Sequence, residues 1–205
     1  MDSGIPQFGS HLLLTTGHRP LAPHTIRDTR SAFLVFGPNM ADAVNCHILF
    51  VCTGNTCRSP LAQALCARLL ADRLGCEPAE LADRGFFVQS AGLAAMIGAE
   101  ATAEAVAVAR ELGADLRGHK SQPITLDLLA QTDFLFAMTQ AHLEMLAALD
   151  LPQRPVLSLL SGGEDIADPI GCSPEVYREC GRQIRHHLET RLADLLQGPA
   201  RRNES

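Results

Sequence analysis

The chain has 205 residues, the length of one domain with room for a sizeable core. Hydrophobic residues make up 46% and charged residues 20%, a composition that is typical of globular proteins and excludes a disordered or fibrous chain. The net charge of -6 argues against nucleic-acid binding, which favours a basic face, and no run approaches the roughly 18 apolar residues of a membrane-spanning helix.

The seven cysteines are unevenly spaced and include no matching CxxC pairs. Neither a disulfide framework nor a zinc site is therefore expected. Because free thiols are typical of reducing compartments, the sequence favours a cytoplasmic location.

Residues 1–40 carry scattered Pro, Gly, His and Thr without a sustained period, and they lack the shape of a signal peptide. We interpret them as an N-terminal extension that is flexible, or as residues upstream of a true start at Met40. Residues 41–198 are predicted to form one domain, and 199–205 a C-terminal tail.

Within this domain, short apolar strands alternate with helical patterns of ten or more residues. The predicted strands are 47–51, 85–90, 133–138 and 155–160, and the predicted helices are 60–74, 100–112, 140–149 and 173–196. This alternation indicates an α/β fold with a single parallel sheet and helices on both faces. Ligands of such sheets bind beyond the carboxyl ends of the strands, where the loop after the first strand lies.

That loop belongs to the stretch ILFVCTGNTCRSPLAQ (48–63), in which a strand leads directly into a helix. The start of a helix offers free N–H groups and the positive end of its dipole to an anion. Gly54 and Asn55 tolerate positive φ where the loop must fold inward, and Arg58 offers a planar fork for two phosphate oxygens. The predicted phosphate-binding residues are Thr53, Gly54, Asn55, Thr56, Cys57, Arg58 and Ser59.

Cys52 begins this loop, and a buried strand cysteine is usually only a small hydrophobe. Here, however, the same dipole field stabilises a thiolate, and Ser59 can donate a hydrogen bond to it. A thiolate below a bound phosphate is placed for in-line attack on phosphorus, which is nucleophilic catalysis without a metal. The nucleotide-binding motifs GxxxxGK[ST] and GxGxxG are absent after the predicted strands.

VCTGNTCRSPLA resembles the signature of the low-molecular-weight protein tyrosine phosphatase family. The resemblance covers roughly residues 46–197 and continues in QSAG (89–92), GHKSQ (118–122), DFLFAMT (133–139) and ADPIG (167–171). It implies a single-domain, four-stranded parallel α/β fold, no cofactor, and a phosphorylated protein as substrate. It also implies that Cys52 is the nucleophile, Arg58 the phosphate clamp and Asp168 the general acid.

Three acidic residues compete for the role of acid, because SGGEDIADPIG (161–171) contains Glu164, Asp165 and Asp168. Acids on a loop are most often solvated surface. We favour Asp168 because Pro169 stiffens the chain beside it and because Asp-Pro is the acid motif of the family; Asp165 is the second choice. Asp168 would protonate the leaving group and then activate the water that hydrolyses a phosphocysteine.

The resemblance also assigns supporting roles to four residues. Asn55, Ser90 and His119 match positions that hold the loop in shape by hydrogen bonds, although a turn Asn, a strand-end Ser and an exposed loop His would look the same. Cys57 resembles the neighbouring thiol that pairs with the nucleophile under oxidation. The alternative for Cys57 is a small residue filling the first turn of the helix.

The substrate side departs from the tyrosine-directed pattern of the family. Family members that act on phosphotyrosine carry Ile where this chain has Thr56, and they place aromatic residues after the Asp-Pro and after the second strand. This chain has Ile170-Gly171 and Leu93–Ile97 at those places. Thr56 leaves room and a hydrogen-bond partner for a guanidinium, as in the related protein-arginine phosphatases, so phosphoarginine is favoured over phosphotyrosine.

Three alternatives stay open on the sequence: a strict tyrosine phosphatase, an arsenate reductase on the same fold, and an inactive phosphate-binding module. An arsenate reductase needs further cysteines that can reach the first, and residues 118–140 contain none, although Cys172 and Cys180 could form a different relay. An inactive module is disfavoured because Cys52, Arg58 and Asp168 are all present. The sequence does not indicate an oligomeric state.

Overall fold

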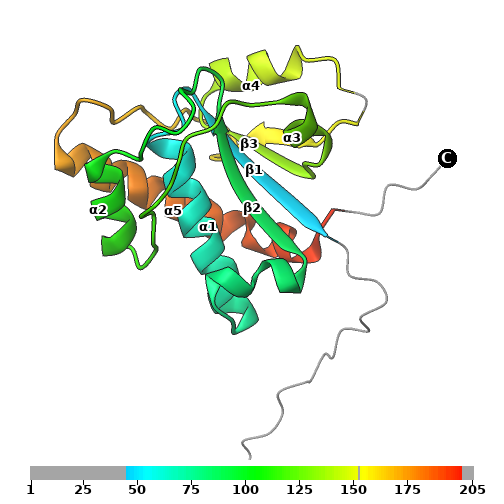
Figure 1. Ribbon diagram of the computed structural model, residues 1–205, viewed down its shortest axis with the longest axis horizontal. Coiled ribbons are helices and arrows are strands. Elements are labelled where there is room, and N and C mark those ends of the chain that lie inside the picture. The colour runs from blue at the N-terminus through cyan, green and yellow to red at the C-terminus, as the bar shows by residue number, and fades with distance from the viewer. Residues whose placement is uncertain (1–44, 152, 200–205) are drawn as a thin grey trace, which may run out of the picture. The chain divides into compact units, whose positions relative to one another are not determined.

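The computed structural model describes residues 45–151 and 153–199 (Figure 1). The predicted N-terminal extension and most of the predicted C-terminal tail lie outside these residues. None of the helices in the two described ranges combines the length and apolar character of a membrane-spanning helix.

The described chain forms four strands, five α-helices and two short 3-10 helices. The strands are β1 (Cys46–Cys52), β2 (Phe86–Gly92), β3 (Phe134–Ala137) and β4 (Val156–Leu159). The helices are α1 (Arg58–Leu74), η1 (Pro78–Glu80), η2 (Ala82–Arg84), α2 (Ala103–Glu111), α3 (Leu126–Ala130), α4 (Gln140–Ala147) and α5 (Pro174–Gln197). The strands pair in parallel in the order β2-β1-β3-β4, which confirms the predicted fold class.

Successive side chains of the strands point to opposite faces of the sheet, and each face has its own apolar core. On β1, Ile48 and Phe50 pack with α1, α2 and α5, whereas Leu49 and Val51 pack with α3 and α4. Figure 1 shows α1 and α5 on one side of the sheet and α3 and α4 on the other. Burial on both faces explains why the central strands β1 and β3 are continuous apolar runs in the sequence.

The sheet order places β1 between β2 and β3. The first crossover runs from β1 to β2 on one side, and the second runs from β2 to β3 on the other side of β1. This is the topological switch point of the sheet, where a crevice opens at the carboxyl ends of parallel strands. The loop from Cys52 to Arg58 lies at this point.

The helices differ from the prediction in two places. The helix predicted over 100–112 spans only Ala103–Glu111, because the Thr102 hydroxyl caps it by accepting a hydrogen bond from the amide of Ala105. The five-residue helix α3 was missed, although Thr125 caps it in the same way. A helix this short has too few apolar positions to show a period.

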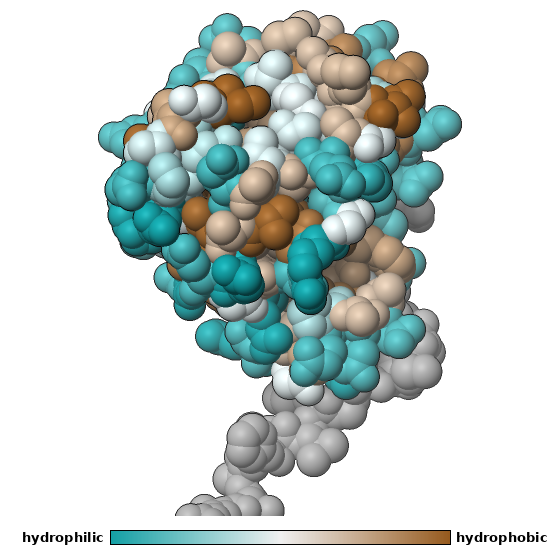
Figure 2. All heavy atoms as spheres, turned by 60° about the vertical axis from the view of Figure 1, so that its left-hand side comes forward, coloured by the Kyte–Doolittle hydropathy of each residue, from teal (hydrophilic) through white to brown (hydrophobic). Residues whose placement is uncertain are grey.

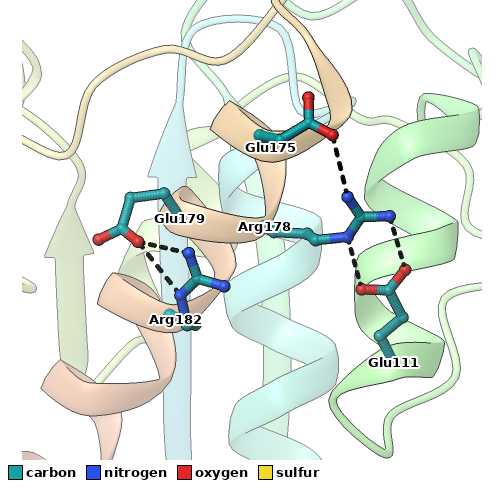
Figure 3. A network of polar contacts seen from close by, with 5 residues as sticks. All are labelled: Glu111, Glu175, Arg178, Glu179 and Arg182. Carbon is teal, nitrogen blue, oxygen red and sulfur yellow. Dashed lines mark hydrogen bonds and ion pairs between the residues drawn. The ribbon is translucent and has the colours of Figure 1, made fainter.

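An ion pair joins α5 to α2 on the outside of the molecule, beside two ion pairs within α5 (Figure 3). Arg178 contacts Glu111 of α2 through two nitrogens and also contacts Glu175, while Arg182 pairs with Glu179. These pairs are exposed and screened by solvent, so they add little to the stability of the fold. On the face turned forward in Figure 2, apolar residues lie in separate patches among polar ones.

Candidate active site

Cys52 ends β1 and is almost fully buried, with 3% of its surface exposed. Its Sγ lies 3.0 Å from the Ser59 Oγ, in the first turn of α1. This contact gives a thiolate one hydroxyl donor, and the axis of α1 begins at the same place. The structure therefore brings the predicted nucleophile to a helix start at the switch point of the sheet.

Asn55 is the centre of the hydrogen-bond network that shapes the loop. Its φ of 54° is in the left-handed region, which Asn tolerates better than most residues. Its Nδ2 donates to the hydroxyls of Ser59 (3.0 Å) and Ser90 (2.9 Å), and its Oδ1 accepts from the amide of Gln122 (2.9 Å). The Nε2 of His119 lies 2.8 Å from the carbonyl oxygen of Asn55.

Two glutamines extend this network and were missed in the sequence. The Ser90 hydroxyl donates to the Gln63 side chain (2.6 Å), and the Gln122 side chain donates to the Ser90 carbonyl (3.0 Å). Gln122 belongs to the GHKSQ stretch that resembles the family, so the sequence did contain a signal for Gln122. Nothing around Gln63 distinguishes it from an ordinary helix residue. The far half of the loop is held by the amide of Thr102, which donates to the Thr56 carbonyl (2.8 Å).

Gly92 pairs with Cys52 across the two strands and gives the loop the space it needs. A Cβ added at Gly92 would lie 2.6 Å from the Thr53 carbonyl oxygen and 2.9 Å from the Asn55 nitrogen. Both atoms belong to the backbone of the loop, so neither can rotate away. The close approach of β2 therefore fixes the path of the phosphate-binding loop.

We predict that Gly92→Ala displaces the loop and lowers the free energy of unfolding by about 1–3 kcal/mol, as overpacking of a filled site does. Urea titration measures the loss of stability, and competition by inorganic phosphate measures the loss of anion affinity. Gly163→Ala is the matched control, because a Cβ there meets nothing within 4 Å. Equal effects of the two substitutions would contradict the steric argument.

Arg58 opens α1 and points its guanidinium to the opposite wall of the site, with a side chain that is only 4% exposed. Its Nη1 donates to the Ile166 carbonyl (3.0 Å) and its Nη2 lies 2.5 Å from the Asp168 Oδ2. Its buried Nε has no hydrogen-bond partner among the described residues. The guanidinium is thus held by the loop after β4, and the Nε–H is among the donors that remain for an oxyanion.

The structure separates the three acids of the loop after β4. Asp168 pairs with Arg58, and its other oxygen accepts from the amide of Ile170 (3.3 Å). The carboxylate of Asp165 instead accepts from the amide of Gln140 (2.7 Å), at the start of α4. Of these acids, Asp168 is therefore the one whose carboxylate contacts Arg58, and its side chain is 41% exposed.

The neighbouring thiol of Cys57 lies at the N-cap of α1 and is buried. Burial raises the pKa of this thiol, and Tyr177 opposes the shift through a side-chain hydrogen bond. Cys180 of α5 is buried in the same core and Cys172 is exposed. All seven cysteines are free, so the pairing of Cys57 with Cys52 stays a prediction.

His142 is a third residue that sequence reasoning missed. Its Nε2 lies 3.0 Å from the Thr53 hydroxyl, and its Nδ1 is buried without a hydrogen-bond partner among the described residues. It lies on α4, so two crossovers separate it from the loop in the chain. Only the topology of the fold brings His142 close to Thr53. A single His in a helical pattern does not indicate such a contact.

Comparison with known proteins identifies the family. The model of the low molecular weight phosphotyrosine protein phosphatase family matches residues 47–201. A protein-arginine-phosphatase of Geobacillus stearothermophilus is 38% identical over 159 residues, which is 73% of this chain and 95% of the relative. The low molecular weight protein-tyrosine-phosphatase Wzb of Escherichia coli K12 is 31% identical, covering 64% of this chain and 82% of the relative.

The fold agrees with solved structures. A crystal structure of a YwlE mutant from Bacillus subtilis superposes with a TM-score of 0.62 at 33% identity, covering 74% of this chain and 99% of the other. With the match of the family model over most of the described residues, the chain belongs to the low molecular weight phosphotyrosine protein phosphatase family.

Proposed function

We propose that this protein phosphatase hydrolyses a phosphorylated residue of a protein, with phosphoarginine preferred over phosphotyrosine, through a phosphocysteine on Cys52. The observation that carries the proposal is the convergence of Cys52, Arg58 and Asp168 at one end of the sheet. Arg58 follows the loop that Cys52 begins, and its Nη2 is 2.5 Å from Asp168. A nucleophile, a cation and a proton donor are the minimal set for displacement at phosphorus without a metal.

In the first step, the thiolate of Cys52 attacks phosphorus and the P–N or P–O bond to the leaving group breaks. The amides of the loop and the Arg58 guanidinium bind the equatorial oxygens, where charge is concentrated in the transition state. The Ser59 hydroxyl, 3.0 Å from Sγ, donates to the sulfur when it leaves the phosphocysteine in the second step.

Asp168 acts on the leaving-group side in both steps. Its proton passes to the departing guanidine nitrogen or phenolate oxygen, and its carboxylate then accepts a proton from the attacking water. The contact with Arg58 holds the carboxyl at the mouth of the site, and its 41% exposure lets a substrate side chain reach it. Inorganic phosphate is the second product.

The side chains at the positions where tyrosine-directed family members carry aromatic residues support the preference for phosphoarginine. In the loop after β2, Met96 and Ile97 are 79% and 84% exposed, and Ile170 after the acid is also exposed. These side chains are aliphatic, so they cannot stack on a phenyl ring. Thr56 is half-buried in the loop, where its hydroxyl can accept a hydrogen bond from a guanidinium. The similarity to a protein-arginine-phosphatase supports the same substrate.

We predict that the wild-type kcat/KM is higher on phosphoarginine peptides than on phosphotyrosine peptides of the same sequence, and that Thr56→Ile shifts the ratio toward phosphotyrosine by about tenfold. A lost hydrogen bond to a substrate group and one added methylene are each worth about 1–3 kcal/mol of discrimination. Thr56→Val is the matched control, because it removes the hydroxyl without adding length. A wild type that prefers phosphotyrosine, together with an unchanged ratio in Thr56→Ile, would reject phosphoarginine.

The proposal includes a reducing, cytoplasmic setting. The described cysteines are free, and a nucleophilic thiol beside other thiols keeps its activity only where disulfides do not form.

A further inference from the structure

His142 lies in the first turns of α4, beside the rim of the phosphate-binding loop. It is 7% exposed, and its backbone amide donates to the Thr139 hydroxyl (3.3 Å) that caps the helix. Its Nε2 reaches the hydroxyl of Thr53 at 3.0 Å. Thr53 is the first residue after Cys52, and its own surface is exposed.

Other contacts hold the loop elsewhere. Side-chain bonds to Asn55 fix its middle, and the amide of Thr102 fixes the carbonyl of Thr56. At Thr53 the backbone carbonyl accepts from the amide of Ala94 (2.9 Å), and the hydroxyl contacts His142. The imidazole is therefore the side-chain anchor of the first residue of the loop.

The two ring nitrogens have different surroundings, which indicates the tautomer. The Nδ1 is buried and has no partner among the described residues. A buried N–H without an acceptor is costlier than a buried lone pair without a donor. The hydrogen therefore belongs on Nε2, which donates to the Thr53 Oγ1 and leaves the hydroxyl hydrogen free to point outward.

Burial lowers the pKa of His142, and the positive charge of Arg58 lowers it further. The carboxylates of Asp168 and Asp165 face the ring from the loop after β4 and raise the pKa, but the net direction is downward. The imidazole is therefore neutral at neutral pH, which is the state with one donor and one acceptor nitrogen.

We propose that His142 is a positioning residue that holds Thr53, and through it the first amides of the phosphate-binding loop, in the geometry that binds an oxyanion. The inference rests on the proposed function only in requiring that this loop binds phosphate. It assigns no contact between His142 and the substrate, and it is independent of the choice between phosphoarginine and phosphotyrosine.

The test uses sulfate, a doubly charged oxyanion, as a competitive inhibitor of p-nitrophenyl phosphate hydrolysis by the full chain. His142→Leu removes the hydrogen bond, whereas His142→Gln keeps a donor near the position of Nε2. Leu146→Ala, in the same helix and 2% exposed, is the control for a purely structural loss. Thr53→Val removes the other half of the contact, and it keeps the test available if His142→Leu does not fold.

We expect His142→Leu and Thr53→Val each to weaken sulfate inhibition and raise KM roughly two- to tenfold, the range of one net hydrogen bond, with a smaller change in kcat. His142→Gln restores most of the affinity, Leu146→Ala lowers the melting temperature only, and the double variant is no worse than either single one. Unchanged sulfate inhibition in both single variants, or fully additive losses, overturns the inference. If sulfate does not inhibit the wild type, the proposed function fails as well.

Stability against pH gives a second readout. Because the pKa of His142 is lowered from its ordinary value of 6.5, its contribution to stability is complete above pH 6.5 and is lost as the pH falls through the lower folded pKa. The free energy of unfolding should therefore fall more steeply below pH 6.5 in wild type than in His142→Gln. Parallel curves would mean that the ring is not held neutral, and the inference would be wrong.

Discussion

Cys52→Ser is expected to lower kcat on p-nitrophenyl phosphate by about 10⁴-fold or more, because removal of a nucleophile leaves only binding and electrostatic stabilisation. The substitution replaces a thiolate by a neutral hydroxyl, which attacks phosphorus far more slowly. The serine Oγ can still form a hydrogen bond with Ser59, which is 3.0 Å from Sγ in the wild type. The loop should therefore keep its shape and its affinity for oxyanions.

Initial rates measure the loss of kcat, and calorimetric titration with inorganic phosphate measures the retained affinity for oxyanions. Cys76→Ser is the control, since Cys76 lies beyond the end of α1 and is only partly buried. An active Cys52→Ser protein would exclude the phosphocysteine route. If the wild type hydrolyses the ester and Cys52→Ser binds phosphate without hydrolysing it, the protein is an enzyme and not an inactive phosphate-binding module.

Asp168→Asn is expected to lower kcat by about 10²- to 10³-fold on a substrate with a poor leaving group and much less on p-nitrophenyl phosphate. The contribution of a general acid is about 10²- to 10⁴-fold, and it is largest where the leaving group most needs a proton. The Asn amide oxygen can still accept a hydrogen bond from the Arg58 Nη2, which lies 2.5 Å from the wild-type carboxylate. The loss can therefore be assigned to the proton.

Asp165→Asn is the matched control, because it makes the same chemical change three positions earlier in the same loop. Asp165 accepts a hydrogen bond from Gln140 at the start of α4, and Asn can accept it too. We expect near wild-type turnover and a loss of stability below about 1 kcal/mol from the weaker interaction with the helix dipole. Rates on a series of aryl phosphates check both variants, and a steeper leaving-group dependence in Asp165→Asn would reverse the assignment.

The sequence predicted the sheet well because its central strands are buried on both faces. The central strands β1 and β3 are then continuous apolar runs between turn residues, and no period has to be resolved. The helix boundaries were less reliable where a side-chain cap decided them, as Thr102 does for α2. The capping box of Glu77 and Glu80 around η1 was also present in the sequence, but it begins a helix of only three residues.

The site was predictable as far as it is local. Cys52, Arg58 and Ser59 fall within eight positions at one strand–helix junction, so their proximity follows from the chain itself. Gln63 and His142 were missed because their partners come from segments 27 and 89 positions away. No pattern in the sequence records which face of a distant helix reaches the loop.

The packing of Gly92 against the loop backbone has a consequence for inhibition. Because β2 and the bonds around Asn55 give the loop its curvature during folding, little conformational entropy is left to lose when an anion arrives. A free phosphate ion meets the same preorganised amides as a phosphorylated side chain. The reaction product is therefore a competitor of the substrate, and the enzyme slows as inorganic phosphate accumulates.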